Sequence, residues 1–262
     1  MFLAVFRGME RNLMKINQNQ SVGRVLFIVE GSRYEFNLLK RIFVDIFHYE
    51  YIQSRRNGMD RYISGKDRFS RVAVINTRES NIRDISENNE FLDDVFRLLL
   101  EKYDYPVDQS AVYYVFDRDP ESNTKPELIR SYIEMLKDPY DNEESFSAGL
   151  LLLSYPSIES YTISCFQNTD QLRVNYGKDV KAYISGNPTI QLNKIDQTAL
   201  EQAASDFIRF LKDCTQEIDI DNFSPVSRKI FDDQEIEYLA GRGFRLFSML
   251  TLAFLQMGII EL

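Results

Sequence analysis

The sequence predicts an α/β protein with a doubly wound, mainly parallel sheet and a helical extension at its C-terminal side. Two observations support this class: short apolar segments rich in β-branched and aromatic residues, and segments of helical period between them. Strands that helices cover on both faces read as continuous apolar runs. A third observation is that acidic residues directly follow three of the apolar segments. Because α/β sheets bind ligands beyond the carboxyl ends of their strands, these acids mark the expected site.

The predicted strands are the apolar segments at 24–29, 71–76, 111–116 and 149–154. None of them alternates strictly between apolar and polar residues, which is typical of strands in the middle of a parallel sheet. Parallel neighbours need crossover connections, and such connections are right-handed in nearly all proteins. We therefore expect a βαβ arrangement throughout this part of the chain.

Helices are predicted between the strands, at 34–47, 89–102 and 126–137. The first places Leu39, Ile42 and Phe43 on one stripe, as expected of a helix that packs on a sheet. The third opens with Pro126, which is favourable in a first helical turn. Regular alternation of strands and helices supports the doubly wound fold.

The segment 50–70 is polar and holds the densest group of basic residues in the chain. Two interpretations remain open at this stage, a solvated loop or a local strip that contacts phosphate groups. The basic residues concerned, with the one that follows the segment, are Arg55, Arg56, Arg61, Lys66, Arg68 and Arg71.

After residue 156 the pattern becomes helical. We expect helices at 157–166 and 196–213, a polar connector at 215–228, and a terminal helix or helix pair from residue 232 or 233 to about 256. These elements predict an N-terminal arm over 1–21, an α/β domain over 22–195 and a helical extension over 196–262.

Composition narrows the possible chemistry. The 262 residues have a net charge of −9, from 40 acidic and 31 basic residues. This balance argues against a protein that coats nucleic acid, but not against a nuclease, because a bound metal reverses the local field of a carboxylate site. The chain has one histidine, His48, and two cysteines without metal-ligand spacing. Carboxylates, lysines and a metal therefore remain as the catalytic repertoire.

The two ends of the sequence carry no membrane or export signal that we recognise. The N-terminal 20 residues lack the pattern of a signal peptide. The uncharged stretch 246–260 is shorter than the roughly 20 residues that span a bilayer. We expect a buried or interface helix there, no membrane contact and a cytoplasmic location, which the cysteine usage also favours.

Glu30 follows the first strand, and Glu35 lies near the start of the next helix. An acid in a first helical turn complements the helix dipole, which is a sufficient structural explanation for Glu35. It explains Glu30 poorly, because Glu30 precedes the helix. Gly31 between them permits a tight turn.

Asp117 and Asp119 form an Asp-x-Asp motif at the end of the third strand. In an extended backbone their side chains point to the same side, where like charges repel unless a cation lies between them. The structural alternative is a polar turn that Asp119 and Pro120 initiate. Glu159, after the fourth strand, has the alternative role of an exposed first-turn acid beside Ser157, a possible helix cap.

Taken in order, these motifs resemble the Toprim domain. They are Glu-Gly-x-x-x-Glu at 30–35, Asp-x-Asp at 117–119 and Ser-x-Pro-x-x-Glu at 154–159. The chain is most similar to the RloB-like and OLD-type Toprim nucleases of bacteria, which include effectors of anti-phage defence. Ile-Glu-Ser-Tyr at 158–161 is similar to the Ile-Glu-Asn-Tyr signature of these nucleases. The resemblance covers about residues 22–185.

The resemblance implies a role for each matching position. Glu30 would be a metal ligand or general base, and Asp117 and Asp119 would bind Mg²⁺ or Mn²⁺. Glu35 and Glu159 would complete a second metal position. Lys181 or Lys178, between which the sequence does not decide, would stabilise phosphate charge.

The chain departs from the family pattern in three respects. Tyr34 stands where relatives often have a small threonine, and the strand at 71–76 ends without an acid. The chain also contains no Gly-rich Walker loop, whereas OLD proteins carry an ATPase in the same polypeptide. If the resemblance is right, an ABC- or SMC-like ATPase would be a separate chain.

The resemblance thus implies a metal-dependent endonuclease that hydrolyses phosphodiester bonds in DNA, RNA or tRNA. It would be the toxic effector of a bacterial anti-phage system that causes abortive infection, under the control of the partner ATPase. A homodimer through the C-terminal helices is a further expectation. The alternative is a Toprim-like adaptor or sensor without catalysis, whose acids are ordinary surface residues.

Overall fold

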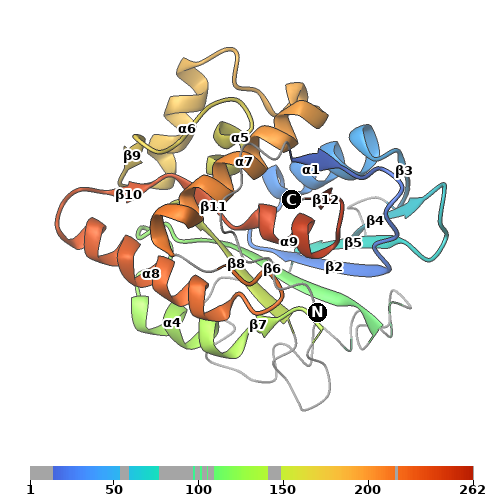
Figure 1. The fold of residues 1–262 in the computed structure, drawn as a ribbon, viewed down its shortest axis with the longest axis horizontal. Coiled ribbons are helices and arrows are strands. Elements are labelled where there is room, and N and C mark those ends of the chain that lie inside the picture. Colours follow the sequence, from blue (N-terminus) through green and yellow to red (C-terminus); the bar gives the residue numbers. More distant parts are fainter. Residues whose placement is uncertain are drawn as a thin grey trace. The chain divides into compact units, whose positions relative to one another are not determined.

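The computed structural model describes residues 14–53, 59–76, 109–140, 149–215 and 218–261, together with residues 97, 101 and 105. Figure 1 shows the arrangement of helices and strands. The chain divides into two compact units. The sheet unit comprises Ser21–Phe116 and Lys125–Leu151, and the helical unit comprises the described part of Met1–Gln20 with Asp117–Thr124 and Leu152–Leu262. The predicted boundaries after residues 21 and 195 stay a prediction.

The sheet has the strand order β11-β8-β6-β2-β5-β4-β3, and β7 pairs with β8. Strand β2 is parallel to both β5 and β6, as predicted, whereas β4 is antiparallel to β5 and β3 to β4. The protein is therefore α/β with a mixed sheet whose centre is parallel. The strands are β2 Arg24–Val29, β3 Tyr49–Gln53, β4 Met59–Ser64, β5 Arg71–Asn76, β6 Ala111–Asp117, β7 Lys137–Asp138 and β8 Gly149–Tyr155.

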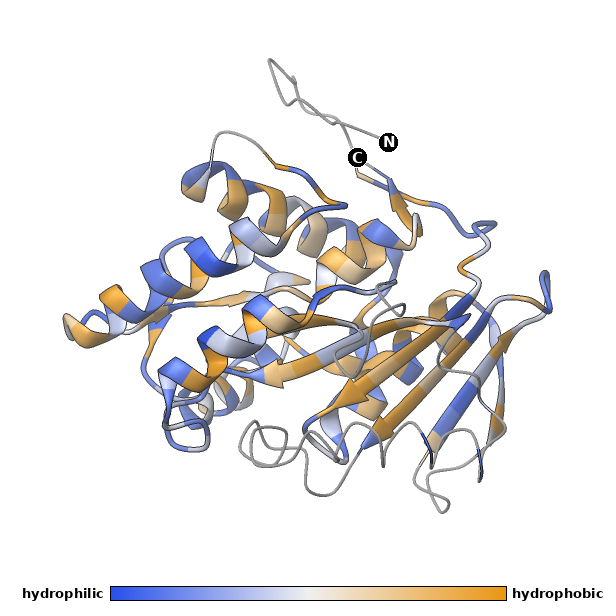
Figure 2. Cartoon of the chain, turned by 90° about the horizontal axis from the view of Figure 1, so that it is seen from below, coloured by the Kyte–Doolittle hydropathy of each residue, from blue (hydrophilic) through white to orange (hydrophobic). Residues whose placement is uncertain are grey.

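All four predicted strands are present, and β6 and β8 are one residue longer than predicted. Their side chains are buried along nearly the whole strand, and Figure 2 shows these strands as apolar. Phe27 of β2 stacks on Tyr113 of β6 with 5.5 Å between ring centroids. Aromatic side chains of neighbouring parallel strands therefore pack against each other in the core.

The elements predicted between the strands are confirmed in part. Helix 34–47 is present as α1 Tyr34–Lys40 followed by the π-helical η1 Arg41–Ile46, and helix 126–137 is α4 Pro126–Met135. Most of the predicted helix 89–102 lies outside the described residues. The interpretation of 50–70 as a loop is wrong, because β3 and β4 form an antiparallel hairpin there. Its strands mix polar and apolar residues and so lack the apolar run of the central strands.

The helical unit contains the end of β8, several short strands and most of the helices after it. The short strand pairs are β1 Lys15–Ile16 with β12 Ile260–Glu261, and β9 Arg173–Val174 with β10 Phe244–Arg245, while β11 Phe247–Ser248 pairs with β8. The helices are α5 Glu159–Ser164, α6 Gly177–Gly186, the 3₁₀ turn η4 Leu192–Lys194, α7 Gln197–Cys214, α8 Ser224–Leu239 and α9 Leu250–Gln256.

The predicted connector 215–228 is wrong at its end, because α8 begins at Ser224 with Pro225 in its first turn. The terminal helical region is a helix pair, α8 and α9, with β10 and β11 between them. Residues Leu250–Leu255 of α9 are buried, so the uncharged terminal segment is a core helix. Among the described residues no helix is long and apolar enough to cross a membrane. Cys165 and Cys214 are free thiols.

Candidate functional site

The end of β6 carries the first acid of the Asp-x-Asp motif, and this acid is tied to the segment after β8. Asp117 Oδ1 accepts a hydrogen bond of 2.8 Å from the backbone N–H of Ile158. Asn123 donates its side-chain N–H to the carbonyl oxygen of Asp117 at 2.6 Å. Asp117 therefore joins three segments: the strand end, the loop 117–124 and the start of the segment that contains Glu159.

The second acid of the motif has two roles in the loop. Asp119 Oδ1 accepts the N–H of Glu121 at 3.1 Å, which is the polar turn of the structural alternative. Its Oδ2 accepts the N–H of Gly177, the first residue of α6, at 3.2 Å. A carboxylate at a helix N-terminus is stabilised by the helix dipole. The turn and the contact with α6 therefore coexist, so the turn alone does not account for Asp119.

Gly177 has to be small at this point. A Cβ atom added to it would lie 2.8 Å from Asp119 Oδ2 and 3.2 Å from the Cβ of Ser157. The missing side chain is what allows the helix to approach the acid. No pattern in the sequence indicates this glycine, because it lies in no recognised motif.

Arg118 stands between the two acids and points to α8. Its Nε and Nη2 donate to the two carboxylate oxygens of Glu235 at 2.7 and 2.8 Å, and its Nη1 donates to the carbonyl oxygen of Asn123 at 3.0 Å. The arginine is only 2% exposed and lies 5.6 Å from the ring centroid of Phe244. A bidentate pair of this kind fixes orientation as well as charge. It holds the backbone between Asp117 and Asp119.

Glu159 is the first residue of α5 and is 5% exposed, so it is not the exposed first-turn acid of the structural alternative. Its Oε1 lies 3.6 Å from Nζ of Lys181 on α6. Lys178 instead pairs with Glu121, whose carboxylate accepts its hydrogen bond and raises its pKa. Of the two candidate lysines, Lys181 is therefore the one beside a predicted site residue. The sequence spacing alone did not separate them.

Among the buried side-chain oxygens of the same unit that have no hydrogen-bond partner within the described residues, two lie in the segments that Asp117 joins. They are Oγ of Ser157 and Oδ1 of Asn123, and both residues are at most 3% exposed. Ser157 is thus not a helix cap, and α5 begins without a side-chain cap. Buried polar atoms are normally paired, so two such oxygens next to acidic groups favour a bound cation or water.

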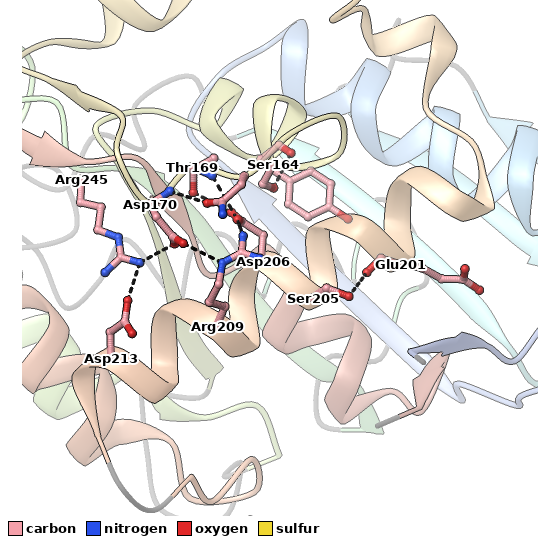
Figure 3. A network of polar contacts seen from close by, with 11 residues as sticks. Ser164, Thr169, Asp170, Glu201, Ser205, Asp206, Arg209, Asp213 and Arg245 are labelled. Atoms are coloured by element: carbon pink, nitrogen blue, oxygen red, sulfur yellow. Dashed lines mark hydrogen bonds and ion pairs between the residues drawn. The ribbon is translucent and has the colours of Figure 1, made fainter. Parts of the chain in front are cut away.

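The polar network in Figure 3 anchors the segment that leads to α6. Thr169 donates its N–H and its hydroxyl to the carboxylate of Asp206 on α7, at 3.1 and 2.6 Å. Burial raises the pKa of Asp206. Asp170 forms ion pairs of 2.8 Å with Arg209 and 2.7 Å with Arg245; although partial burial opposes it, these contacts lower the pKa of Asp170. The network therefore fixes residues 169–170 against α7 and β10.

The remaining predicted residues, Glu30 and Glu35, belong to the sheet unit. Glu30 directly follows β2, where its N–H donates to the carbonyl of Val115 at 3.3 Å and its carbonyl accepts from Asn76 at 2.7 Å. Glu35 is buried in the first turn of α1, and its Oε1 accepts the N–H of Gly31 at 2.8 Å. Glu35 thus closes the turn between β2 and α1, a structural role that the sequence left open.

Gly31→Ala is expected to disturb this turn. The new Cβ would lie 2.6 Å from the carboxylate carbon of Glu35, so the carboxylate has to leave its position and its hydrogen bond. We expect a loss of roughly 1–3 kcal/mol in the free energy of unfolding, measured by urea denaturation. Gly65→Ala is the matched control, because nothing lies within 4 Å of a Cβ at that glycine. Equal losses in the two variants would contradict the role given to Glu35.

Within the helical unit the structure thus brings together Asp117, Asp119, Glu159 and Lys181. It adds Asn123, Ser157 and the Arg118–Glu235 pair, which the sequence did not indicate as site residues. Among the described residues, no group of three or more His, Cys, Asp or Glu is arranged to hold a metal ion. The available donors are oxygens, which Mg²⁺ and Mn²⁺ prefer. Comparison with protein-family models, curated proteins and solved structures finds no match to this chain.

Proposed function

We propose that this chain is a metal-dependent nuclease of the Toprim kind, in which Asp117 and Asp119 hold Mg²⁺ or Mn²⁺. The observation that carries the proposal is the cluster of Asp117, Asp119 and Glu159 beyond the strand ends of β6 and β8, with Lys181 beside Glu159. Toprim membership itself, and the helical extension as part of that fold, rest on the motif order in the sequence.

The chemistry of the donors fits such an ion. Mg²⁺ is usually bound through one or two carboxylates, with water and substrate phosphate as its other ligands, so a cage of three protein acids is not required. Asp117, Asp119 and the buried oxygens of Asn123 and Ser157 are the groups of this unit that would hold it. Bound there, the ion would activate water and stabilise charge at a phosphodiester group.

The protein groups around these acids have complementary tasks. Lys181 is a flexible cation next to Glu159 and would face the negative charge of a phosphate. The Arg118–Glu235 pair keeps the two aspartates in place. Glu30 and Glu35 as further metal ligands stay predictions from the family resemblance, as do the DNA, RNA or tRNA substrate, the separate ATPase, the role in anti-phage defence and the cytoplasmic location.

A homodimer through the C-terminal helices also stays a prediction, and the exposure of apolar side chains favours one of the two helices for it. Helix α9 is buried within its own unit. Helix α8 exposes Ile236 and Leu239, at 61% and 80%. Of the two helices, α8 is therefore the one with apolar side chains that a second copy would cover.

A second candidate function is the adaptor or sensor without catalysis. It is favoured by the fact that Asp117, Asp119 and Glu35 each accept a backbone N–H, which gives all three a structural role without a metal. In this case the acids would organise loops, and the chain would act through a partner protein.

Metal binding distinguishes the two functions. With Mg²⁺ or Mn²⁺ in 100-fold excess over its dissociation constant, linkage predicts a gain of about 2.7 kcal/mol in the free energy of unfolding. Urea denaturation with and without metal measures this, and cleavage assays on labelled single- and double-stranded DNA and RNA run in parallel. Ca²⁺ and K⁺ at matched ionic strength control for general salt effects. If millimolar Mn²⁺ produces neither stabilisation nor cleavage, the adaptor is the favoured function.

A further inference from the structure

The turn between β4 and β5 is a rigid loop that presents one aromatic side chain to solvent. Ser64–Ser70 form this turn, drawn in cyan in Figure 1, and Phe69 within it is 83% exposed. Asp67 organises the turn: its Oδ1 accepts the N–H of Phe69 at 2.9 Å and its Oδ2 accepts the hydroxyl of Ser70 at 2.7 Å. The exposure of Phe69 is therefore imposed by a hydrogen-bonded loop.

Further bonds attach the turn to the rest of the sheet unit. The hydroxyl of Ser21 donates to Asp67, and the hydroxyl of Ser70 accepts the N–H of Val22 at 2.9 Å. Ser64 donates its N–H to the carbonyl of Ser70 at 3.0 Å, which closes the loop. These hydrogen bonds hold the loop in one conformation, so its side chains have a fixed arrangement. A fixed arrangement lowers the entropic cost of binding a ligand.

Basic residues also occupy the start of β2 and of β5, the strand that follows the turn. Arg24 and Arg71 are direct neighbours in the register of these parallel strands, and like charges in such positions destabilise a sheet. Arg61, on the adjacent strand β4, is paired with Ala73, two residues beyond Arg71. We call Arg24, Arg61, Lys66, Arg68 and Arg71 the basic edge.

The buried Tyr105 lies within electrostatic reach of three of these charges. Burial raises its pKa to about 12, while the positive charges of Arg24, Arg61 and Arg71 act in the opposite direction. Between residues 61 and 71 the sequence has a single acid, Asp67, which the turn already uses. A concentration of positive charge in a chain of net charge −9 indicates an anionic ligand.

We propose that Phe69 and the basic edge form a binding surface for single-stranded nucleic acid. Exposed aromatic rings stack on bases whatever the sequence, and cations beside them contact the phosphates. The surface lies at the start of the parallel strands, whereas Asp117 is the last residue of β6 and Glu30 follows β2. It shares no residue with the proposed metal site.

A membrane surface fits the same turn less well. Membrane-binding elements bury an apolar face of several residues, with basic residues beside it. Here Phe69 is flanked by Arg68 and Ser70, and the exposed residue before Asp67 is Lys66. One phenylalanine among charged and polar neighbours suits stacking on a base better than insertion into lipid.

The test is fluorescence anisotropy with labelled oligothymidine and oligouridine in EDTA, so that binding is measured without cleavage and independently of the proposed nuclease activity. Phe69→Ala is expected to weaken binding about tenfold. Arg68→Gln with Arg71→Gln is expected to make the negative slope of log affinity against log salt shallower by about 0.7 for each cation removed. All three side chains are exposed, so circular dichroism should show intact folds.

Leu239→Ala and Arg242→Gln, exposed residues of the other unit, are the matched controls and should bind as the unaltered chain does. The proposal is overturned if the unaltered chain does not bind either oligonucleotide, or if Phe69→Ala and the arginine variant bind as tightly as the controls. If the chain sediments with phosphatidylserine vesicles and binds neither oligonucleotide, the proposal is overturned in favour of a membrane surface.

Discussion

Replacing Glu235 with alanine is expected to lower the free energy of unfolding by about 3–5 kcal/mol. The reason is that Arg118 is buried, and without Glu235 its guanidinium would keep a charge with no opposite charge beside it. Removing one partner of a buried pair costs this much even where the pair itself contributes little. Urea denaturation at neutral pH measures the loss.

The same helix offers a control at the surface. Glu237 pairs with Arg242, whose side chain is 57% exposed, so Glu237→Ala is expected to cost less than 1 kcal/mol. Replacing both Arg118 and Glu235, with methionine and leucine, should cost much less than Glu235→Ala alone, because no buried charge remains. A similar loss in Glu235→Ala and Glu237→Ala would show that the buried pair does not hold the loop as described.

The Arg118–Glu235 pair also illustrates what the sequence does not reveal. In the sequence, Arg118 occupies the variable position of an Asp-x-Asp motif. Its partner, Glu235, lies 117 residues further along the chain. Local patterns contain no information on such a contact. The choice between Lys178 and Lys181 is of the same kind, because it depends on which helix face turns toward Glu159.

The central strands were predictable for a physical reason. Strands β2, β5, β6 and β8 are buried on nearly every residue, so each is a continuous apolar run. The hairpin β3–β4 was missed because β3 is largely exposed and both strands include charged side chains, a composition that a polar loop shares. The start of α8 was missed because Pro225 suggests a connector, whereas proline is well accommodated in a first helical turn.

Asp117→Asn is expected to reduce metal-dependent cleavage at least about 100-fold while leaving the fold intact. Asparagine has nearly the same shape, and its side-chain oxygen can still accept the N–H of Ile158 that Asp117 binds at 2.8 Å. What it lacks is the negative charge. Charge stabilisation by a bound metal is worth several kcal/mol, and each 1.36 kcal/mol corresponds to a factor of ten in rate.

Initial rates with Mn²⁺ on the preferred substrate measure this loss, and the metal-induced gain in stability should disappear in the same variant. Glu121→Gln is the matched control, because it removes a carboxylate from the same loop whose described contact is Lys178 at the surface. If Asp117→Asn cleaves as fast as the control, Asp117 serves only to join the loop to the segment after β8. A structural acid of that kind would favour the adaptor, since its hydrogen bond, not its charge, would be the property that the fold uses.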